Sequence, residues 1–127
     1  MMQATARQMD GMAQARERAD TPDAPVDLVH LARHTLGNRE LEREVLRLFS
    51  RQSKMLTERM RDADDGEALE RCLHTLLGSA RSIGAWKVAE AVEQAQQALH
   101  EDGRAELSAV SAAVAESAEF IGTLLDA

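Results

Sequence analysis

Apolar positions along the chain recur mostly at steps of three and four residues, the period of amphipathic α-helices. The pattern predicts four long helices: one capped by Asn38 and closed by Asp64-Asp65-Gly66, one over about 67–83, one over about 85–101, and one after the turn at Asp102-Gly103. In the first of them, the expected core positions are Leu41, Val45, Leu48, Met55, Leu56 and Met60, with Gln52 filling one slot. Amphipathic helices joined by short links predict an antiparallel bundle.

A shorter helix is expected before these four. Asp27 is placed to cap it, Leu28 and Leu31 supply its apolar side, and Gly37 is placed to end it. Two prolines just upstream, Pro22 and Pro25, disfavour helix in the residues before them. We therefore expect a flexible or frayed N-terminal segment over 1–25 and a helical domain over 26–127.

Composition supports the same fold class. Of the 127 residues, 44% are hydrophobic but only 2% are aromatic, and there are 2 prolines. Strands favour aromatic and β-branched side chains, whereas Ala, Leu, Glu and Arg favour helix. The prediction is an all-α protein, an antiparallel four-helix bundle with a short additional N-terminal helix.

Charge and the remaining composition exclude several kinds of partner. The formal net charge is −7, which disfavours binding to nucleic acid because phosphate contacts need clustered Lys and Arg. We find no run of about 18 apolar residues for a membrane span and no apolar signal segment at the N-terminus. The single cysteine fits a reducing compartment. The expected location is cytoplasmic, without a membrane.

The helix over 67–83 carries the most informative side chains. At about 100° per residue, its apolar side chains fall on one face and His74 lies almost opposite them. Three residues lie within about 60° of His74 on the same outward stripe: Arg71, Gly78 and Arg81. A glycine inside a helix costs about 1 kcal/mol relative to alanine. Its missing side chain would let another molecule approach His74 closely.

This placement suits a nucleophilic histidine. A free imidazole titrates near pH 6.5, so much of it is neutral and nucleophilic near pH 7. A phosphoryl carrier needs little more than an exposed nucleophile on a rigid helix when its partner positions the phosphoryl group. The geometry alone leaves an ordinary surface histidine equally open.

The segment around His74 resembles a family signature. It reads His-Thr-Leu-Leu-Gly-Ser-Ala-Arg-Ser-Ile-Gly over 74–84, and resembles the H-x-L-K-G-S-[AS]-x-x-[LIV]-G pattern of histidine-containing phosphotransfer (HPt) domains. The resemblance extends more weakly over about 26–125 through helix lengths and order.

The resemblance implies that His74 accepts a phosphoryl group from an aspartate of one receiver domain and passes it to another, in a bacterial-type two-component phosphorelay. It implies a response-regulator receiver or a hybrid histidine kinase as partner, and Mg²⁺ supplied by the receiver. Gln96, 22 positions after the histidine, corresponds to a glutamine that orients the imidazole. The chain would then be a monomeric phosphoryl carrier rather than a multiple-turnover enzyme.

One position departs from the family pattern. The lysine three residues after the histidine is Leu77 here, which cannot compensate phosphate charge. In one interpretation Arg81 or Arg71 supplies that charge, and Leu77 joins Arg71, Gly78 and Arg81 in a partner surface. In the other, the chain is a degenerate adaptor that binds a receiver or kinase without relaying phosphate. A purely structural bundle is the third possibility.

The remaining candidates have plainer interpretations. His30 and His34 are spaced as two metal ligands on one helix, but nothing is patterned to complete a site, so packing or surface roles are favoured. Cys72 is expected in the core, and His100 near a helix C-terminus. Trp86 is assigned equally to the bundle end or to a partner surface. No metal site is predicted in the chain.

Overall fold

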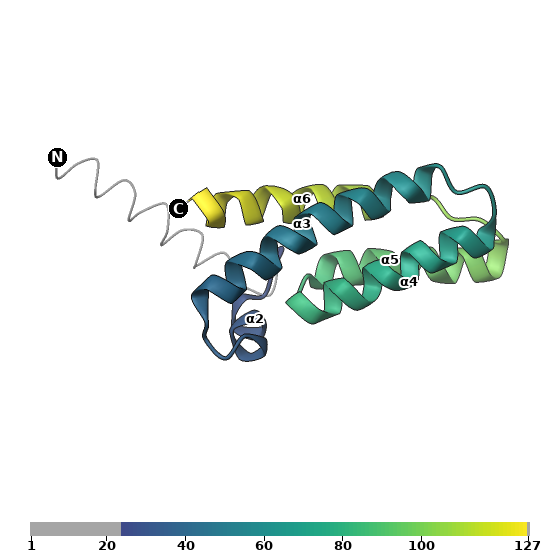
Figure 1. The fold of residues 1–127 in the computed structure, drawn as a ribbon. Helices are drawn as coiled ribbons and strands as arrows, with labels where there is room; N and C mark the ends of the chain where they lie inside the picture. Colours follow the sequence, from purple (N-terminus) through teal and green to yellow (C-terminus); the bar gives the residue numbers. More distant parts are fainter. Residues whose placement is uncertain (1–23, 127) are drawn as a thin grey trace.

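A computed structural model of the protein describes residues 24–126. This part contains five helices and no strand (Figure 1): α2 (Leu28–His34), α3 (Arg39–Arg61), α4 (Gly66–Ile83), α5 (Trp86–Asp102) and α6 (Ser108–Asp126). The all-α prediction is confirmed. The flexible segment expected over 1–25 falls almost wholly outside the described residues, so its boundary stays a prediction.

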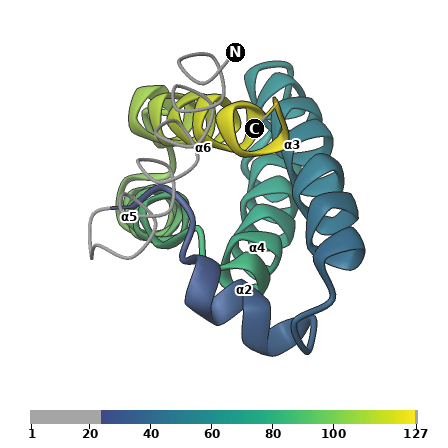
Figure 2. The ribbon, with the colours of Figure 1, turned by 90° about the vertical axis from the view of Figure 1, so that its left-hand side faces the viewer.

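The four long helices form a bundle in which each contacts two others. α3 packs against α4 and α6, and α5 packs against the same two helices. Seen along its axis, the bundle has α3 and α4 on one side and α5 and α6 on the other (Figure 2). The short helix α2 crosses the end where α4 passes into α5, and it contacts α4.

Side-chain caps begin three of these helices. Asp27, Asn38 and Asp65 each accept a hydrogen bond from the backbone N–H three residues ahead, at 3.1, 3.0 and 2.8 Å. Each cap satisfies a donor that the helix itself cannot pair and contributes about 1 kcal/mol. The helix starts expected from Asp27 and Asn38 are thus set by local chemistry.

Gly84 ends α4 in a conformation that needs glycine. Its φ is +81°, and an added Cβ would lie 2.9 Å from the Cβ of Asp27. The Asp27 N–H donates to the Gly84 carbonyl at 2.9 Å. The corner between α4 and α5 and the start of α2 are therefore packed together, and this holds α2 on the bundle.

The core is mostly aliphatic. Its largest fully buried side chains include Leu31, Leu73, Leu76, Val92 and Ile121, together with one aromatic ring, Phe120. Two hydroxyls of α3, on Ser53 and Thr57, are also buried, and each donates to a carbonyl of its own helix. Satisfied in this way, polar side chains occupy core positions without leaving unpaired groups.

The core face expected for α3 is partly wrong. Leu56 and Met60 are buried, but Leu41, Leu48 and Met55 are 45%, 56% and 42% exposed. The buried face instead includes Leu46 and Phe49 together with the two hydroxyl residues. Because α3 packs against both α4 and α6, these two neighbours determine which of its faces is buried. The apolar positions of α3 alone predict a face turned to a different angle around the helix axis.

α6 is long and apolar enough, by length and composition, to cross a membrane. In this fold it packs against α3 and α5, and buries Val110, Val114, Ser117, Phe120 and Ile121. The bundle buries 28% of this apolar window, and one helix of this kind is by itself weak evidence for a membrane span.

Candidate functional site

His74 lies on the outer side of α4. Its side chain is exposed and forms no hydrogen bond or ion pair with any described residue, whereas the adjacent Leu73 is fully buried. A polar ring between buried positions points outward because the helical period places it opposite the core face. The imidazole is free to meet another molecule.

Gly78, one turn further on, is also exposed. A Cβ added there would have no neighbouring atom within 4 Å, in contrast to Gly84. No packing inside the described fold therefore requires glycine at position 78, although it costs about 1 kcal/mol relative to alanine. What the glycine provides is a low surface beside His74.

The residues beside Gly78 keep this surface low. The Thr75 hydroxyl donates to the Arg71 carbonyl and the Ser82 hydroxyl to the Gly78 carbonyl, both at 3.0 Å. Ser79 donates to the Gln52 side chain of α3 at 2.8 Å. Gly78 is therefore flanked by short side chains bonded to their own helix or to α3.

A groove of about 410 Å³ runs between α3 and α4 beside His74. We call it the α3–α4 groove; it is lined by Gln52, Met55, Leu56, Arg59, Ala63, Ala68, Arg71, Cys72 and Thr75. Arg71 and Arg59 bring two guanidinium groups to it from opposite helices. Neither the place of Arg59 in this groove nor the exposure of Met55 follows from the sequence, because both depend on how the two helices are paired. Cys72, expected in the core, is half-buried here.

Gln96 lies on the other side of α4. It lines a cleft of about 280 Å³ between α4 and α5, together with Gly66, Glu70, Leu99, His100 and Gly103. The structure shows no hydrogen bond between Gln96 and His74, both of which it describes. The residue nearest to His74 along α4 on this cleft is Glu70, one turn earlier.

The two candidate arginines each pair with a carboxylate. Arg81 meets Glu93 of α5 at 3.2 Å, and Arg71 meets Glu67 at 3.7 Å. All four side chains are more than half exposed, and exposed pairs of this kind contribute at most about 1 kcal/mol. Such weak pairs leave both guanidinium groups available to a stronger anion.

The structure corrects the expectation for Leu77. We expected its side chain in an exposed apolar contact with a partner, but it is 7% exposed and belongs to the core cluster. The Leu77 side chain is covered by the helices that pack against α4. Leu77 therefore offers no contact surface, and its replacement of a lysine removes a charge without adding an exposed patch.

The histidines of α2 pack at the bundle end. His30 donates from Nε2 to the Arg81 carbonyl at 3.0 Å, and His34 donates from Nδ1 to the His30 carbonyl at 3.2 Å. The Trp86 ring meets His30 edge-on, and its indole N–H donates to Asp27 at 3.1 Å. In the described part of the chain, no group of three or more His, Cys, Asp or Glu is placed to hold a metal ion.

Asp27 is the one described group with a clear pKa change. Burial acts to raise the pKa of its carboxyl, but hydrogen bonds from the His30 N–H and the Trp86 indole outweigh burial and lower it below the ordinary value. The surroundings of Asp27 in the folded protein therefore stabilise its charged carboxylate form.

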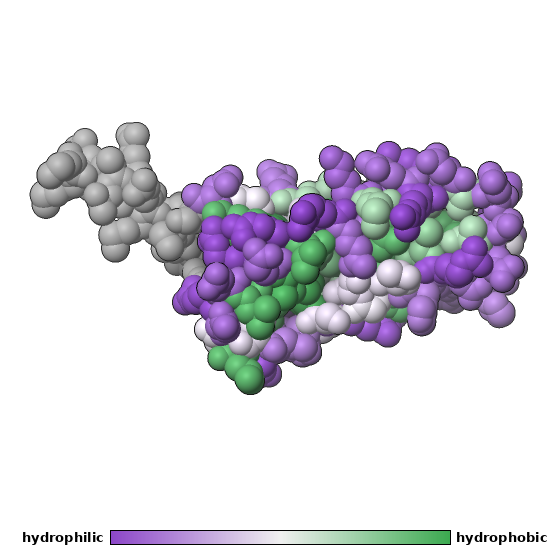
Figure 3. Space-filling model, in the orientation of Figure 1, coloured by the Kyte–Doolittle hydropathy of each residue, from purple (hydrophilic) through white to green (hydrophobic). Residues whose placement is uncertain are grey.

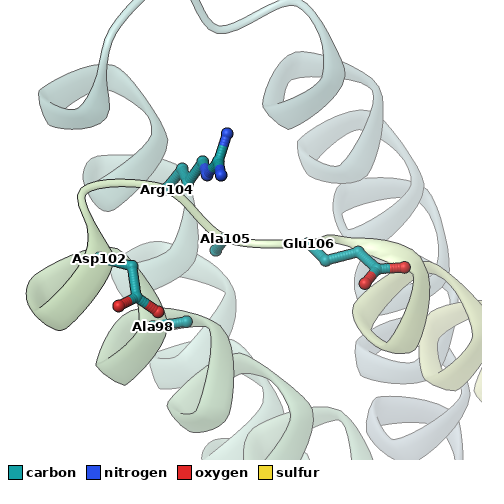
Figure 4. A pocket seen from close by; sticks show the side chains of 5 residues that line it. All are labelled: Ala98, Asp102, Arg104, Ala105 and Glu106. Carbon is teal, nitrogen blue, oxygen red and sulfur yellow. The ribbon is translucent and has the colours of Figure 1, made fainter.

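A wider hollow of about 670 Å³ lies at the corner between α5 and α6. Figure 4 shows the charged side chains of Asp102, Arg104 and Glu106 pointing in different directions around it. Groups that do not converge cannot fix a ligand, so this hollow is not a second candidate site.

Fold and surface together define a class of protein: a helical bundle that presents an unbonded histidine, His74, beside an open glycine on an exposed helix surface. Among protein-family models, the Hpt domain matches residues 2–127. The chain belongs to the Hpt domain family, which has a phosphotransfer role in two-component signalling and interacts with receiver domains and kinases. Searches of curated proteins and of solved structures give no match.

Proposed function

We propose that this chain relays a phosphoryl group between receiver-domain aspartates through phosphohistidine at His74. The observation that carries the proposal is Gly78. Its stability cost has no reason within the described fold, because nothing lies within 4 Å of an added Cβ. A partner that must bring a phosphoaspartate to the imidazole needs this space.

The proposed step is an in-line displacement. A ring nitrogen of His74 attacks the phosphorus of the partner's aspartyl phosphate, and the bond between phosphorus and the carboxylate oxygen breaks with its electron pair returning to the carboxylate. Transfer to a second receiver reverses the step, so His74 is regenerated. The chain acts as a carrier, and Mg²⁺ held by the receiver would neutralise the phosphoryl charge.

Three residues are proposed to assist. Gln96 would orient the imidazole after a side-chain rotation, since it lies across the α4–α5 cleft from the turn that precedes His74. Arg71, in the α3–α4 groove, would balance phosphate charge that a lysine at position 77 cannot supply. Arg81 would balance phosphate charge only by breaking its ion pair with Glu93.

We also propose that the protein is bacterial, cytoplasmic and monomeric.

Transfer of radiolabelled phosphate tests the proposal. Phosphorylated receiver domains from the same genome are incubated with the chain, and the expected result is an acid-labile, base-stable adduct absent from His74→Gln. The matched control is His34→Gln, since His34 is exposed on α2, outside the α4–α5 cleft, and should not affect labelling. Label that persists in His74→Gln would show that another residue is the acceptor.

The adaptor is the second candidate, favoured by the buried Leu77 in place of a lysine. It predicts that a receiver binds the chain but never transfers label. Phosphoramidate, a small phosphoryl donor, separates the two causes of failure. Labelling of His74 by phosphoramidate without transfer from any bound receiver supports the adaptor.

A further inference from the structure

Of the four carboxylate and guanidinium side chains on α4, Glu70 is the one without an ion pair among the described residues. Glu67 meets Arg71 at 3.7 Å, and Arg81 meets a carboxylate of α5 at 3.2 Å. Glu70 is exposed and forms no hydrogen bond with another described residue. Its carboxylate is therefore available to a neighbour, and it lies one turn before His74.

The spacing of Glu70 and His74 brings the two side chains together on α4. Residues four apart on a helix have Cβ atoms about 5–6 Å apart, and side chains lean toward the helix N-terminus. The His74 ring therefore leans over the turn that carries Glu70. The same reach is seen in α2, where Nδ1 of His34 donates to the carbonyl of His30, four residues earlier, at 3.2 Å. Nδ1 is the ring nitrogen nearer the backbone, so this arrangement leaves Nε2 of His74 facing outward.

The other polar groups around His74 are poor acceptors for its Nδ1–H. The guanidinium groups of Arg59 and Arg71 in the α3–α4 groove can only donate. Thr75 is adjacent to His74 in the chain, and adjacent positions on a helix do not face each other. Where α3 and α4 meet, Figure 3 shows apolar surface beside a band of intermediate hydropathy. Glu70 is thus the acceptor best placed for the ring.

We propose that Glu70 is a positioning residue whose carboxylate accepts a hydrogen bond from Nδ1–H of His74 and keeps the lone pair of Nε2 free for the phosphoryl group. The proposal rests on the proposed function and adds which ring nitrogen reacts. A neutral imidazole carries one proton, and the hydrogen bond made by one nitrogen decides which of the two carries it. Because a carboxylate can only accept, the proton stays on Nδ1.

The proposed step balances without a proton transfer. Nε2 of His74 forms a bond to phosphorus as the bond from phosphorus to the carboxylate oxygen of the aspartyl phosphate breaks, and the electron pair leaves with that oxygen. The proton remains on Nδ1, so the phosphorylated ring carries a positive charge beside Glu70. The carboxylate stabilises this charge, and it is unchanged when the phosphoryl group moves on.

Gln96 gains a defined role from this arrangement. Glu70 and Gln96 line the same α4–α5 cleft, and an amide N–H of Gln96 is a suitable donor to a carboxylate. Gln96 would therefore act on the His74 ring through Glu70. His100 lines the cleft as well, and it is the competing partner for the Glu70 carboxylate.

Nitrogen NMR of the isotope-labelled, unphosphorylated protein tests the proposal without any partner. At about pH 8.5, where an ordinary imidazole is neutral, the chemical shifts of the ring nitrogens report which of them carries the proton. We expect His74, assigned by the loss of its signals in His74→Gln, to be protonated mainly on Nδ1. Glu70→Ala should move the proton mainly to Nε2 and slow labelling by phosphoramidate at least about threefold.

Glu67→Ala is the matched control. It removes the same charge from an exposed position of the same helix, but seven residues from His74. The proton should stay on Nδ1, and labelling should not slow. Alanine favours helix, and circular dichroism confirms that each variant is folded.

A His74 ring protonated mainly on Nε2 in the original protein overturns the proposal, which is the result expected if Glu70 pairs with His100 instead. A proton that stays on Nδ1 in Glu70→Ala also overturns it, because the backbone carbonyl of residue 70 would then be the acceptor, as in α2. So does an equal effect of Glu67→Ala. Selection of Nδ1–H by Glu70 without transfer of label from any receiver would strike the relay and leave the role of Glu70 standing.

Discussion

At the scale of single residues, the glycine inside α4 and the glycine that ends it serve different purposes. Gly84 is required by the fold, because its left-handed backbone touches Asp27. Gly78 has open space around it and lies one turn from the exposed His74. A glycine that weakens its own helix, relieves no contact and lies one turn from an exposed histidine is most simply explained by what approaches that histidine.

Replacing Gly78 by alanine should therefore stabilise the protein and impair transfer. We expect the free energy of unfolding to rise by about 1 kcal/mol and label transfer from a receiver to fall at least about tenfold. Urea denaturation and a transfer time course measure the two. Gly122→Ala in α6, which also meets nothing within 4 Å, should stabilise without affecting transfer. Unchanged transfer in Gly78→Ala would remove the main support for the relay.

Restoring the family's lysine at position 77 should be costly. Leu77→Lys places an ammonium group at a site that is 7% exposed, and we expect a loss of about 1–3 kcal/mol in unfolding free energy as the lysine bends its charge outward. Thr75→Lys, at an exposed position of the same helix, should cost little. A Leu77→Lys protein as stable as the original would show that position 77 is open to solvent.

At the scale of helices, local sequence and packing act at different places. Caps at Asp27, Asn38 and Asp65 begin three helices through bonds between near neighbours. The corner at Gly84 depends on α2, more than fifty residues earlier in the chain. Gly84 ends α4 and Gly103 ends α5, both with a left-handed backbone. Substitutions at these two glycines separate the effect of local backbone conformation from the effect of packing against α2.

Gly84→Ala should destabilise far more than Gly103→Ala. Both glycines have a φ near +75 to +80°, where alanine costs about 1–2 kcal/mol, but only Gly84 has a neighbour within 3 Å of the added Cβ. Thermal unfolding should show the lower Tm in Gly84→Ala, by several degrees. Equal Tm values would mean that α2 moves aside without cost.

The attachment of α2 should weaken in acid. The folded-state pKa of Asp27 is lowered, so its contribution to stability is present above the unfolded pKa, near 3.9, and is lost as pH falls through the folded pKa. Asp27→Asn keeps a capping side chain but removes the charge. Urea denaturation should therefore show a stability difference between the two proteins at pH 6 that shrinks below about pH 4. A difference independent of pH would exclude this role of the carboxylate.

At the scale of the whole molecule, the division of charge matters more than its total. A net charge of −7 argues against nucleic acid, yet the side bearing His74 is the basic one. Long-range attraction of an acidic partner to such a side is weakened by salt, whereas attack on a small donor is far less sensitive.

Raising salt from about 50 to 500 mM should therefore slow transfer from a receiver several-fold and leave phosphoramidate labelling of His74 nearly unchanged. Parallel time courses with the two donors measure the difference. Equal slowing of both reactions would point to an effect on His74 itself rather than on partner encounter.

The sequence by itself determined much of this protein. Helical period and capping residues determined the all-α class, the order of the helices and most of their ends, because these depend on neighbours within one turn. The same period placed His74 opposite Leu73 and Leu76, and its motif pointed to the Hpt family that residues 2–127 match.

Tertiary structure alone decided where the covered faces of α3 and α4 begin and end. Leu77 became buried while Leu41, Leu48 and Met55 stayed exposed. Arg59 came beside Arg71, and the basic helix α3 came to the side of His74. These outcomes depend on the angle at which helices distant in sequence pack, and hydropathy along one helix does not contain that angle.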